Sequence, residues 1–564
     1  MDQFRKIIVS LLKEKTDLIE DEIDKCIEIP PDSKMGDYAF PCFSLSKTLK
    51  KPPNKIASEL AEQISPVNPI NEIKAIGPYL NFFLDKKIFS EVVLKKISNE
   101  TDLYGSDAIG TDKTVVIDYS SPNIAKHLAV HHLRSALIGN ALYNIYKELG
   151  YKCVGINHLG DWGTQFGQLI VAYRKWGEKN LEKYTITDLN KLYVKFHQEA
   201  EKDIHLEDEA REWFKKLENG DGEAIALWKR FKDISLLEFQ RVYKMLGIQF
   251  DAFVGESFYN TMVDDTVLRI QKKGLSCISE QALIIDLERY NMPPCLLRKK
   301  DDTTLYATRD IAAAEYRSAE YHFDKMIYVV GSEQKLHFNQ VFKVLELMGY
   351  DWANNCVHVD FGLMKFKEGR MSTRKGMVVL LEDLLIEAVE RIKKIIEEKN
   401  PSLKDKEIVA NDVGIGAVIF ADLSTKRNKD VIFDWDTVLN FEGETGPYVQ
   451  YTHARLCSIL RKYGKAVTSN IDFALLKEDD AINLIKVLWQ YPFVLLKSAQ
   501  FYEPSLISNY LIDVCAKVNK FYNSHRVLSE DDDLTKARIL MVNAARQIIK
   551  NGLKILGMHA PTEM

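Results

Sequence analysis

A glycine-rich stretch from Asn157 to Gly167 holds the most informative group of polar side chains in this sequence. It follows the apolar run from Cys153 to Ile156, which is typical of a buried strand. In an open α/β sheet, ligands bind in the loops that leave the carboxyl ends of the strands. We therefore predict that this stretch, with Gly160 and Asp161 in it, lines a ligand site.

A second polar loop runs from Ser120 to His132 and leads into a segment with helical periodicity. The first turn of a helix has unpaired backbone N–H groups and a positive dipole, which together favour phosphate. Lys126 adds a mobile positive charge, and the imidazoles of His131 and His132 can donate hydrogen bonds to phosphate oxygens. The loop therefore predicts a phosphorylated ligand. For His127, a solvated loop position is an equal alternative.

A dense basic turn lies at residues 369–376, where two glycines flank small hydroxyl side chains and three cations. A small residue such as Ser372 lets the backbone approach a polyphosphate closely. Arg370, Arg374 and Lys375 could neutralise the charge that develops as pyrophosphate leaves. The alternative is a basic surface turn without a function.

Tyr306 and Asp310 are four residues apart at the start of a helical pattern, so they share one helix face. A guanidinium ligand prefers a planar carboxylate and often an aromatic neighbour. The pair therefore predicts a guanidinium site. Taken alone, Asp310 would also fit a helix N-terminus, where the dipole stabilises a carboxylate by about 0.3–1 kcal/mol.

Basic and aromatic side chains also alternate near the end of the sequence, in residues 442–455 and 517–550. Cations interleaved with aromatic rings suit contact with a nucleic-acid backbone together with stacking on unpaired bases. For most individual residues, a solvated helix face above a core aromatic remains the alternative.

The first two loops must be positioned by the elements around them. Val115–Tyr119 is a short β-rich run, residues 133–149 have apolar side chains at helical spacing, and Lys152–Ile156 is the next strand pattern. A strand, helix and strand in this order predict parallel pairing with a right-handed crossover. Met326–Val330 is a further buried-strand pattern.

The rest of the sequence divides by pattern. Residues 1–108 resemble a small α/β segment, and residues from about 178 to 295 are charged and helical in pattern, which suggests an insertion. From residue 406 onward no strand pattern is evident. The helical periods there predict helices over Asp436–Tyr463, Asp480–Ala499, Ser505–Tyr522 and Ala537–Leu556.

Composition narrows the class of protein. The 564 residues carry 76 Lys+Arg against 81 Asp+Glu, so a nucleic-acid partner would have to be held by local basic faces. The eight cysteines show no C-x-x-C pair or zinc spacing, which favours free thiols in a reducing compartment and no structural metal. No apolar run approaches the roughly 20 residues that a bilayer span needs. We expect a cytoplasmic protein that does not enter a membrane.

Four of these motifs resemble arginyl-tRNA synthetases, and they occur in that family's order. Residues 157–167 resemble the GDWGTQFG loop, and residues 120–135 resemble the SPNIAK…HIGH…LRS region. Residues 371–376 resemble that family's form of the KMSKS loop, and residues 445–455 resemble the TGPYxQYxHAR run of the anticodon-binding domain. The core of the first loop departs from the family pattern: Ala129 replaces its first histidine and His131 replaces its glycine, while His132 is kept.

The resemblance implies an ATP-dependent ligase that activates L-arginine and transfers it to the 3′ end of tRNA(Arg). It implies an α/β fold with three parts: an N-terminal α+β domain over 1–108, a Rossmann-type catalytic domain over 109–405 with the insertion, and an all-α bundle over 406–564. ATP with its Mg²⁺, arginine and tRNA would be the partners of a chain that we expect to be a monomer.

The resemblance also implies roles for individual residues. The amino acid would contact Ser121, Asn123, Tyr306, Asp310 and Gln334. Catalysis would involve Lys126, His131, His132, Arg370, Met371, Ser372, Arg374 and Lys375, and ATP would contact Ala129, Val130, His132, Gly160, Asp161, Met371 and Ser372. The tRNA would contact Tyr448, Gln450, Tyr451, His453, Arg455, Asn523 and Arg526.

Two other hypotheses stay open. Ala129 and His131 motivate a non-catalytic paralogue that binds tRNA without activating arginine, although the Tyr306–Asp310 pair and the basic turn argue against it. A class I synthetase for another amino acid is the second. A cysteine enzyme would require a thiolate-rich zinc site, and a valine or isoleucine enzyme an apolar pocket in place of Asp310.

Overall fold

The computed structural model describes residues 3–30, 33–178, 180–300, 305–367 and 379–564. The chain divides into two compact units. Unit 1 comprises Met1–Tyr104, Leu456–Tyr491 and Asp513–Ile548, and unit 2 comprises Gly105–Arg455, Pro492–Ile512 and Ile549–Met564. Four of the described helices contribute residues to both units: α17 (Gly446–Tyr463), α19 (Tyr491–Phe501, by its first residue alone), α20 (Ser505–Ser524) and α21 (Asp532–Ile555).

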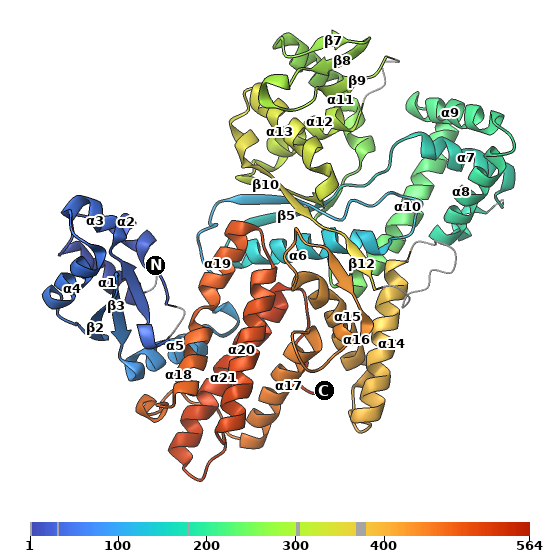
Figure 1. Cartoon of the computed structure of the whole chain (residues 1–564). Coiled ribbons are helices and arrows are strands. Elements are labelled where there is room, and N and C mark those ends of the chain that lie inside the picture. Colours follow the sequence, from blue (N-terminus) through green and yellow to red (C-terminus); the bar gives the residue numbers. More distant parts are fainter. Residues whose placement is uncertain (1–2, 31–32, 179, 301–304, 368–378) are drawn as a thin grey trace. The chain divides into compact units, whose positions relative to one another are not determined.

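Unit 2 is built on a five-stranded parallel sheet with the strand order β11-β10-β4-β5-β6. Helix α6 (Leu133–Glu148) connects β4 to β5 and packs against the sheet (Figure 1). This arrangement confirms the predicted strand–helix–strand unit and the α/β class. The strands are β4 (Thr114–Asp118), β5 (Lys152–Asn157), β6 (Ala252–Phe253), β10 (Lys325–Gly331) and β11 (Cys356–Phe361).

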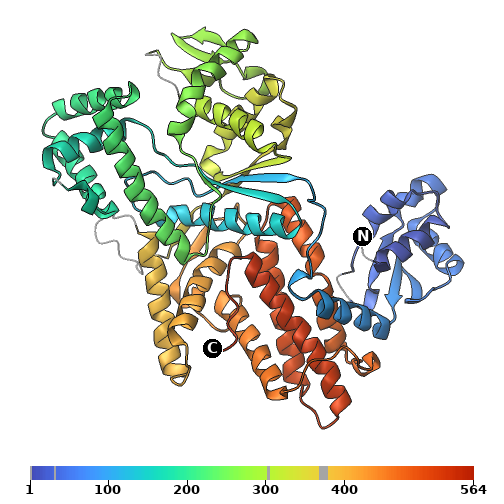
Figure 2. The same ribbon diagram turned by 180° about the vertical axis from the view of Figure 1, so that it is seen from behind.

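The other helices of unit 2 form groups around this sheet (Figures 1 and 2). One group, coloured teal to green, is α7 (Thr164–Trp176), α8 (Ile186–Ala200), α9 (His205–Glu218) and α10 (Gly222–Met245). A second group is α11 (Glu256–Lys272), α12 (Tyr306–Tyr321) and α13 (Lys335–Leu347). The rest are α14 (Leu381–Lys399), α15 (Lys406–Leu423), α16 (Trp435–Val438) and α19 (Tyr491–Phe501).

Several short strands differ from the sequence-based expectation. The pattern of residues 178–295 predicted helices alone, but β6 lies there and joins the parallel sheet. A small antiparallel sheet also begins in that range, formed by β7 (Cys277–Ser279), β8 (Ala282–Ile285) and β9 (Cys295–Arg298). After residue 406, β13 (Val431–Phe433) pairs in parallel with β12 (Met364–Phe366). Strands of two to four residues are too short to show a period of two.

Unit 1 contains a three-stranded antiparallel sheet in the order β1-β3-β2. Its strands are β1 (Tyr38–Pro41), β2 (Ile70–Ile76) and β3 (Tyr79–Leu84). The helices that accompany them are α1 (Gln3–Lys13), α2 (Glu20–Cys26), α3 (Phe43–Leu49), α4 (Pro53–Gln63) and α5 (Lys86–Glu100). This part of unit 1 is α+β, as the sequence predicted.

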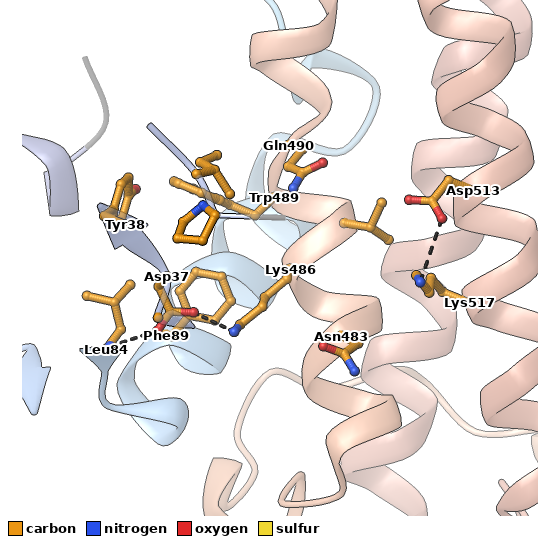
Figure 3. Close-up of a pocket in the computed structure, with 14 residues that line it drawn as sticks. Asp37, Tyr38, Leu84, Phe89, Asn483, Lys486, Trp489, Gln490, Asp513 and Lys517 are labelled. Atoms are coloured by element: carbon orange, nitrogen blue, oxygen red, sulfur yellow. Dashed lines mark hydrogen bonds and ion pairs between the residues drawn. The ribbon is translucent and has the colours of Figure 1, made fainter. Parts of the chain in front are cut away.

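Helix α18 (Asp479–Trp489) connects the C-terminal helices of unit 1 to this α+β part through direct side-chain contacts (Figure 3). The Trp489 ring meets the rings of Phe4, Tyr38 and Phe89 edge-on, at centroid distances of 6.2, 5.7 and 5.8 Å. Lys486 forms a 2.5 Å ion pair with Asp37. These contacts border a cavity of about 380 Å³, which aromatic and polar side chains line together.

All eight cysteines lie in the described part of the chain and all are free thiols. Only Cys277, on strand β7, is exposed. None of the described helices is both long and apolar enough to cross a bilayer.

Candidate active site

The strand order of unit 2 creates a switch point between β4 and β10. From β4 the chain continues to β5 and β6 on one side, and it returns as β10 and β11 on the other. Asp118 pairs with Tyr328, so the carboxyl ends of β4 and β10 lie near each other. Ligands of open α/β sheets bind in the crevice at such a point. Residues 120–123 follow β4 there, and residues 331–334 follow β10.

The loop after β4 is held in a strained conformation. Ser120, Ser121 and Ala125 have positive φ angles of 74°, 46° and 63°, which L-residues seldom adopt. The Ser120 N–H donates to Ser135 Oγ at 2.8 Å, and the Ala125 N–H donates to Ser235 Oγ at 2.8 Å. Backbone strain of this kind persists only where the surroundings enforce it, and it is concentrated at functional sites.

The same loop is joined to the glycine-rich loop after β5. The Ile124 N–H donates to the Gly160 carbonyl at 3.2 Å, and the Gly160 N–H donates to the Pro122 carbonyl at 3.0 Å. A Cβ on residue 160 would come within 1.9 Å of Asn123 Oδ1, so any other residue there would have to displace the Asn123 side chain. Two predicted ligand loops, distant in sequence, therefore form one wall.

Asp161 has a role in this wall that the sequence did not indicate. Its carboxylate is buried and accepts hydrogen bonds from the Ser257 N–H at 2.9 Å and the Ser257 hydroxyl at 2.8 Å. Lys232 forms a 2.6 Å ion pair with it. The carboxylate thus holds the first turn of α11, and any contact with a nucleotide would come from the backbone of this residue.

His131 and His132 lie together at the N-terminus of α6. Nδ1 of His132 lies 3.1 Å from the Ala129 nitrogen and 3.2 Å from the Ala129 carbonyl oxygen, so the Ala129 backbone holds this ring nitrogen in either tautomer. Burial, with a smaller effect of His131, lowers the pKa of His132 to about 4. The exposed His131 ring lies 4.0 Å from the His132 ring, and partial burial lowers its pKa too. The pair therefore places two imidazoles with lowered pKa values beside the positive end of a helix dipole.

Residues 370–375, the predicted second phosphate loop, lie outside the described residues, but the segments on either side are described. The Val130 N–H donates to the Val379 carbonyl at 3.1 Å, and the Leu381 N–H donates to the Leu128 carbonyl at 2.9 Å. On the other side, Lys367 follows β12 and pairs with Asp434 at 3.3 Å. The segment that follows the second loop is therefore attached to Leu128 and Val130 of the first.

Lys126 and His127 lie against the α8 segment. Lys126 Nζ is 4.9 Å from the centre of the Tyr193 ring, and Nε2 of His127 is 3.2 Å from Thr187 Oγ1. Both contacts are made at the surface, which leaves the lysine ammonium available to a ligand.

The predicted guanidinium pair lies on the first turns of α12. The Tyr306 side chain is 65% exposed, and Asp310 Oδ2 accepts a hydrogen bond from His337 Nε2 at 2.6 Å. Gln334 is exposed and precedes His337 by one helical turn. The structure therefore brings Asp310 on α12 close to the first turn of α13, which Gln334 immediately precedes.

Two side chains in this region could not be predicted from the sequence, because their partners are distant in the chain. Arg317 is buried and forms a 2.8 Å ion pair with Asp118, and its second terminal nitrogen lies 3.2 Å from His158 Nδ1. Glu256 lies 3.2 Å from Arg309, and burial, only partly offset by that arginine, raises the pKa of Glu256 to about 7. A single sequence gave no signal for either pairing.

Comparison with known proteins identifies the family. Residues 93–435 match the model described as "tRNA synthetases class I (R), catalytic domain", residues 2–84 match the arginyl tRNA synthetase N terminal domain, and residues 449–564 match the DALR anticodon binding domain. The arginine–tRNA ligase of Clostridioides difficile is 51% identical over the full length of both chains, and that of Clostridium botulinum is 52% identical. The chain belongs to the arginyl-tRNA synthetase family.

Solved arginyl-tRNA synthetases have the same fold. The Thermus thermophilus structure matches with a TM-score of 0.82 at 26% identity, covering 95% of this chain and 96% of that one. The Plasmodium falciparum structure matches with a TM-score of 0.83 at 25% identity over the whole of both chains. This family membership makes the protein an aminoacyl-tRNA synthetase of class I, with an arginine–tRNA ligase activity.

The residues that the synthetase resemblance assigned to tRNA divide into two groups. Gln450 is buried and donates to the Asp412 and His559 carbonyls at 3.0 and 2.9 Å, and buried His453 lies 2.8 Å from the Pro561 carbonyl. These two side chains hold the C-terminal segment and do not face a ligand. The residues with solvent-accessible side chains are Tyr448, Tyr451, Arg455, Asn523 and Arg526.

Proposed function

We propose that the synthetase activates arginine at the crevice between the ends of β4 and β10. The observation that carries this proposal is the approach of Asp310 to the first turn of α13, beside Gln334 and the switch point. Asp310 and Tyr306 would bind the guanidinium in a pocket that Gln334 also lines, and Ser121 and Asn123 would contact the main-chain end of the amino acid. Two separate groups then fix the two ends of one substrate, which gives the positioning that a reaction without a covalent intermediate needs.

ATP would lie against the N-terminus of α6. Its phosphates would accept hydrogen bonds from His131 and His132, and Lys126 would add positive charge. The backbone of Ala129, Val130, Gly160 and Asp161 would border the nucleotide. Residues Arg370, Met371, Ser372, Arg374 and Lys375 would come over the phosphates from the adjoining loop.

The reaction has two steps. The arginine carboxylate attacks the α-phosphorus of ATP, which forms arginyl-adenylate and releases pyrophosphate. A ribose hydroxyl of the terminal adenosine of tRNA then attacks the arginyl carbonyl and releases AMP. Cations near the phosphates would stabilise the charge that develops on the leaving pyrophosphate.

Mg²⁺ would enter with ATP, because phosphate oxygens and water are the ligands it prefers and protein carboxylates add only one or two. Within the described ranges, no group of three or more His, Cys, Asp and Glu side chains is arranged to hold a metal ion. We further propose that tRNA(Arg) binds through the exposed aromatic and polar residues of the helical region, that arginine activation depends on bound tRNA, and that the enzyme acts as a cytoplasmic monomer.

The first experiment is aminoacylation of bulk tRNA with radiolabelled arginine and ATP, beside pyrophosphate exchange with and without tRNA. Charging together with tRNA-dependent exchange is the expected result. It would also show that Ala129 and His131 support catalysis. Tight tRNA binding with neither charging nor exchange would instead favour the non-catalytic paralogue that the altered first loop suggests.

A further inference from the structure

Asp310 is held by a histidine from a different helix. His337 is in the first turn of α13, and its Nε2 lies 2.6 Å from Asp310 Oδ2. A carboxylate accepts, so Nε2 must carry the proton and donate it. The side chains are 21% and 25% exposed, which places the hydrogen bond partly out of water.

The imidazole is itself supported from behind. The His337 ring meets the Phe338 ring edge-on, with centroids 5.2 Å apart. Phe338 is buried and lies between the rings of Tyr328, at 5.0 Å, and His358, at 4.6 Å. The buried Phe338 ring therefore restricts the position of the His337 ring. The His337 ring in turn restricts the Asp310 carboxylate on α12.

The hydrogen bond uses only one oxygen of the carboxylate. Within the part of the chain that the structure describes, Oδ1 of Asp310 has no hydrogen-bond partner. The carboxylate plane is thus fixed on one side and open on the other. A guanidinium has planar, fork-shaped donors, so its binding depends on the plane of the acceptor more than the binding of a compact ammonium does.

Arg309 anchors the same turn of α12 to a different helix, α11. Its guanidinium contacts Glu256 and Asn260 of α11, each at 3.2 Å. Consecutive residues of α12 are therefore tied to α11 and to α13. This arrangement fixes the backbone under Asp310 as well as its side chain.

We propose that His337 is a positioning residue for substrate arginine, acting through Asp310. The proposal rests on the proposed contact between Asp310 and the guanidinium. Ordering the carboxylate before binding removes an entropic cost from the binding step. Loss of the His337 side chain should therefore lower the affinity for arginine. ATP binding and turnover at saturating arginine depend on it far less.

The test compares His337→Ala, His337→Gln and His337→Asn in the full-length enzyme, with Asn339→Ala on the exposed side of α13 as control. Alanine should raise KM for arginine about tenfold or more, since a hydrogen bond to a charged group is lost. KM for ATP and kcat should stay within about threefold. Glutamine places its amide nitrogen close to the position of Nε2 and should restore most of the affinity, whereas asparagine, whose amide reaches only the Nδ1 position, should not.

A double-mutant cycle with Asp310→Ala separates this proposal from the proposed function. If His337 acts through Asp310, adding His337→Ala to Asp310→Ala should raise KM for arginine no further. Additive losses, or equal KM values for the glutamine and asparagine variants, would overturn the positioning role. A normal arginine KM in Asp310→Ala alone would overturn the guanidinium site itself. Thermal unfolding of each variant identifies a loss of fold, and the glutamine–asparagine comparison remains decisive if alanine is not tolerated.

Discussion

Burial controls the protonation state of single residues around the crevice. The pKa of His132 is lowered to about 4 and that of Glu256 is raised to about 7, each mainly by removal from water. Both shifts favour the neutral form of the side chain. Near neutral pH the His132 ring is therefore uncharged, and phosphate binding there would depend on ring geometry and the α6 dipole.

His131 provides a residue-scale test of the altered first loop. Replacing His131 with alanine removes the exposed ring beside His132 and, with it, one donor for phosphate. A hydrogen bond to a charged oxygen contributes about 1.5–3 kcal/mol, so KM for ATP should rise about tenfold or more. Steady-state kinetics with varied ATP would measure it, and exposed His205→Ala on α9 is the control. An unchanged ATP dependence would mean that the ring does not contact ATP.

Glu256 should make stability depend on pH. Its pKa in the fold, about 7, is above the ordinary value of 4.5, so its contribution to stability is complete below about pH 4.5 and is lost as pH rises through about 7. Glu256→Gln removes this dependence. The variant should gain up to about 3 kcal/mol relative to the wild type between pH 4.5 and 8. Denaturant unfolding across this pH range would measure the gain.

The exposed Glu320→Gln controls for loss of a charge on the same group of helices. Parallel stability profiles of wild type and Glu256→Gln would contradict a raised pKa in the folded state.

At the scale of elements, close helix packing depends on Gly167 in the glycine-rich stretch. A Cβ at this position of α7 would lie 1.9 Å from the Ala210 carbonyl oxygen on α9. Gly167→Ala must force these helices apart, at a cost of about 1–3 kcal/mol or more. Gly222→Ala, at the start of α10 with open space around its Cβ, should be neutral or stabilising. The temperature of thermal unfolding should therefore fall for Gly167→Ala and stay unchanged or rise for Gly222→Ala.

How far the sequence could predict these elements depended on their length. The run Val115–Tyr119 and the helical period of residues 133–149 were long and regular, and β4 and α6 follow them. A single helix over Asp436–Tyr463 was wrong: α16 ends at Val438, and α17 begins only at Gly446. Gly443, with a φ of 106°, lies in the intervening turn, where a helix cannot continue.

The site could be predicted where a motif lay within one local segment, as with Tyr306 and Asp310. It could not be predicted where function depends on a partner far along the chain. His337 is 27 residues from Asp310 and Arg317 is 199 residues from Asp118, and only the folded sheet brings these pairs together. The same limit applies to Gln450 and His453, for which the local motif suggested contact with tRNA. In the fold, both side chains are buried against backbone carbonyls near the C-terminus.

At the scale of the whole molecule, packing around the Trp489 ring stabilises unit 1. Its ring contacts three aromatic residues of the N-terminal part, so Trp489→Ala should destabilise unit 1 by about 3–5 kcal/mol. Hydrogen exchange should speed up throughout residues 1–104. Exposed Phe501→Ala, which belongs to unit 2, should leave that exchange unchanged. Equal protection in both variants would show that the ring does not hold unit 1 together.

The exposed thiol of Cys277 allows a spectroscopic label to be attached to the native chain. Burial raises the pKa of Cys42 to about 11 and of Cys153, Cys295 and Cys356 to about 12, which suppresses their thiolates. A maleimide dye should therefore attach preferentially to the outer strand of the small β7–β9 sheet. A dye on that strand would mark the native chain at a defined position, without a single engineered cysteine.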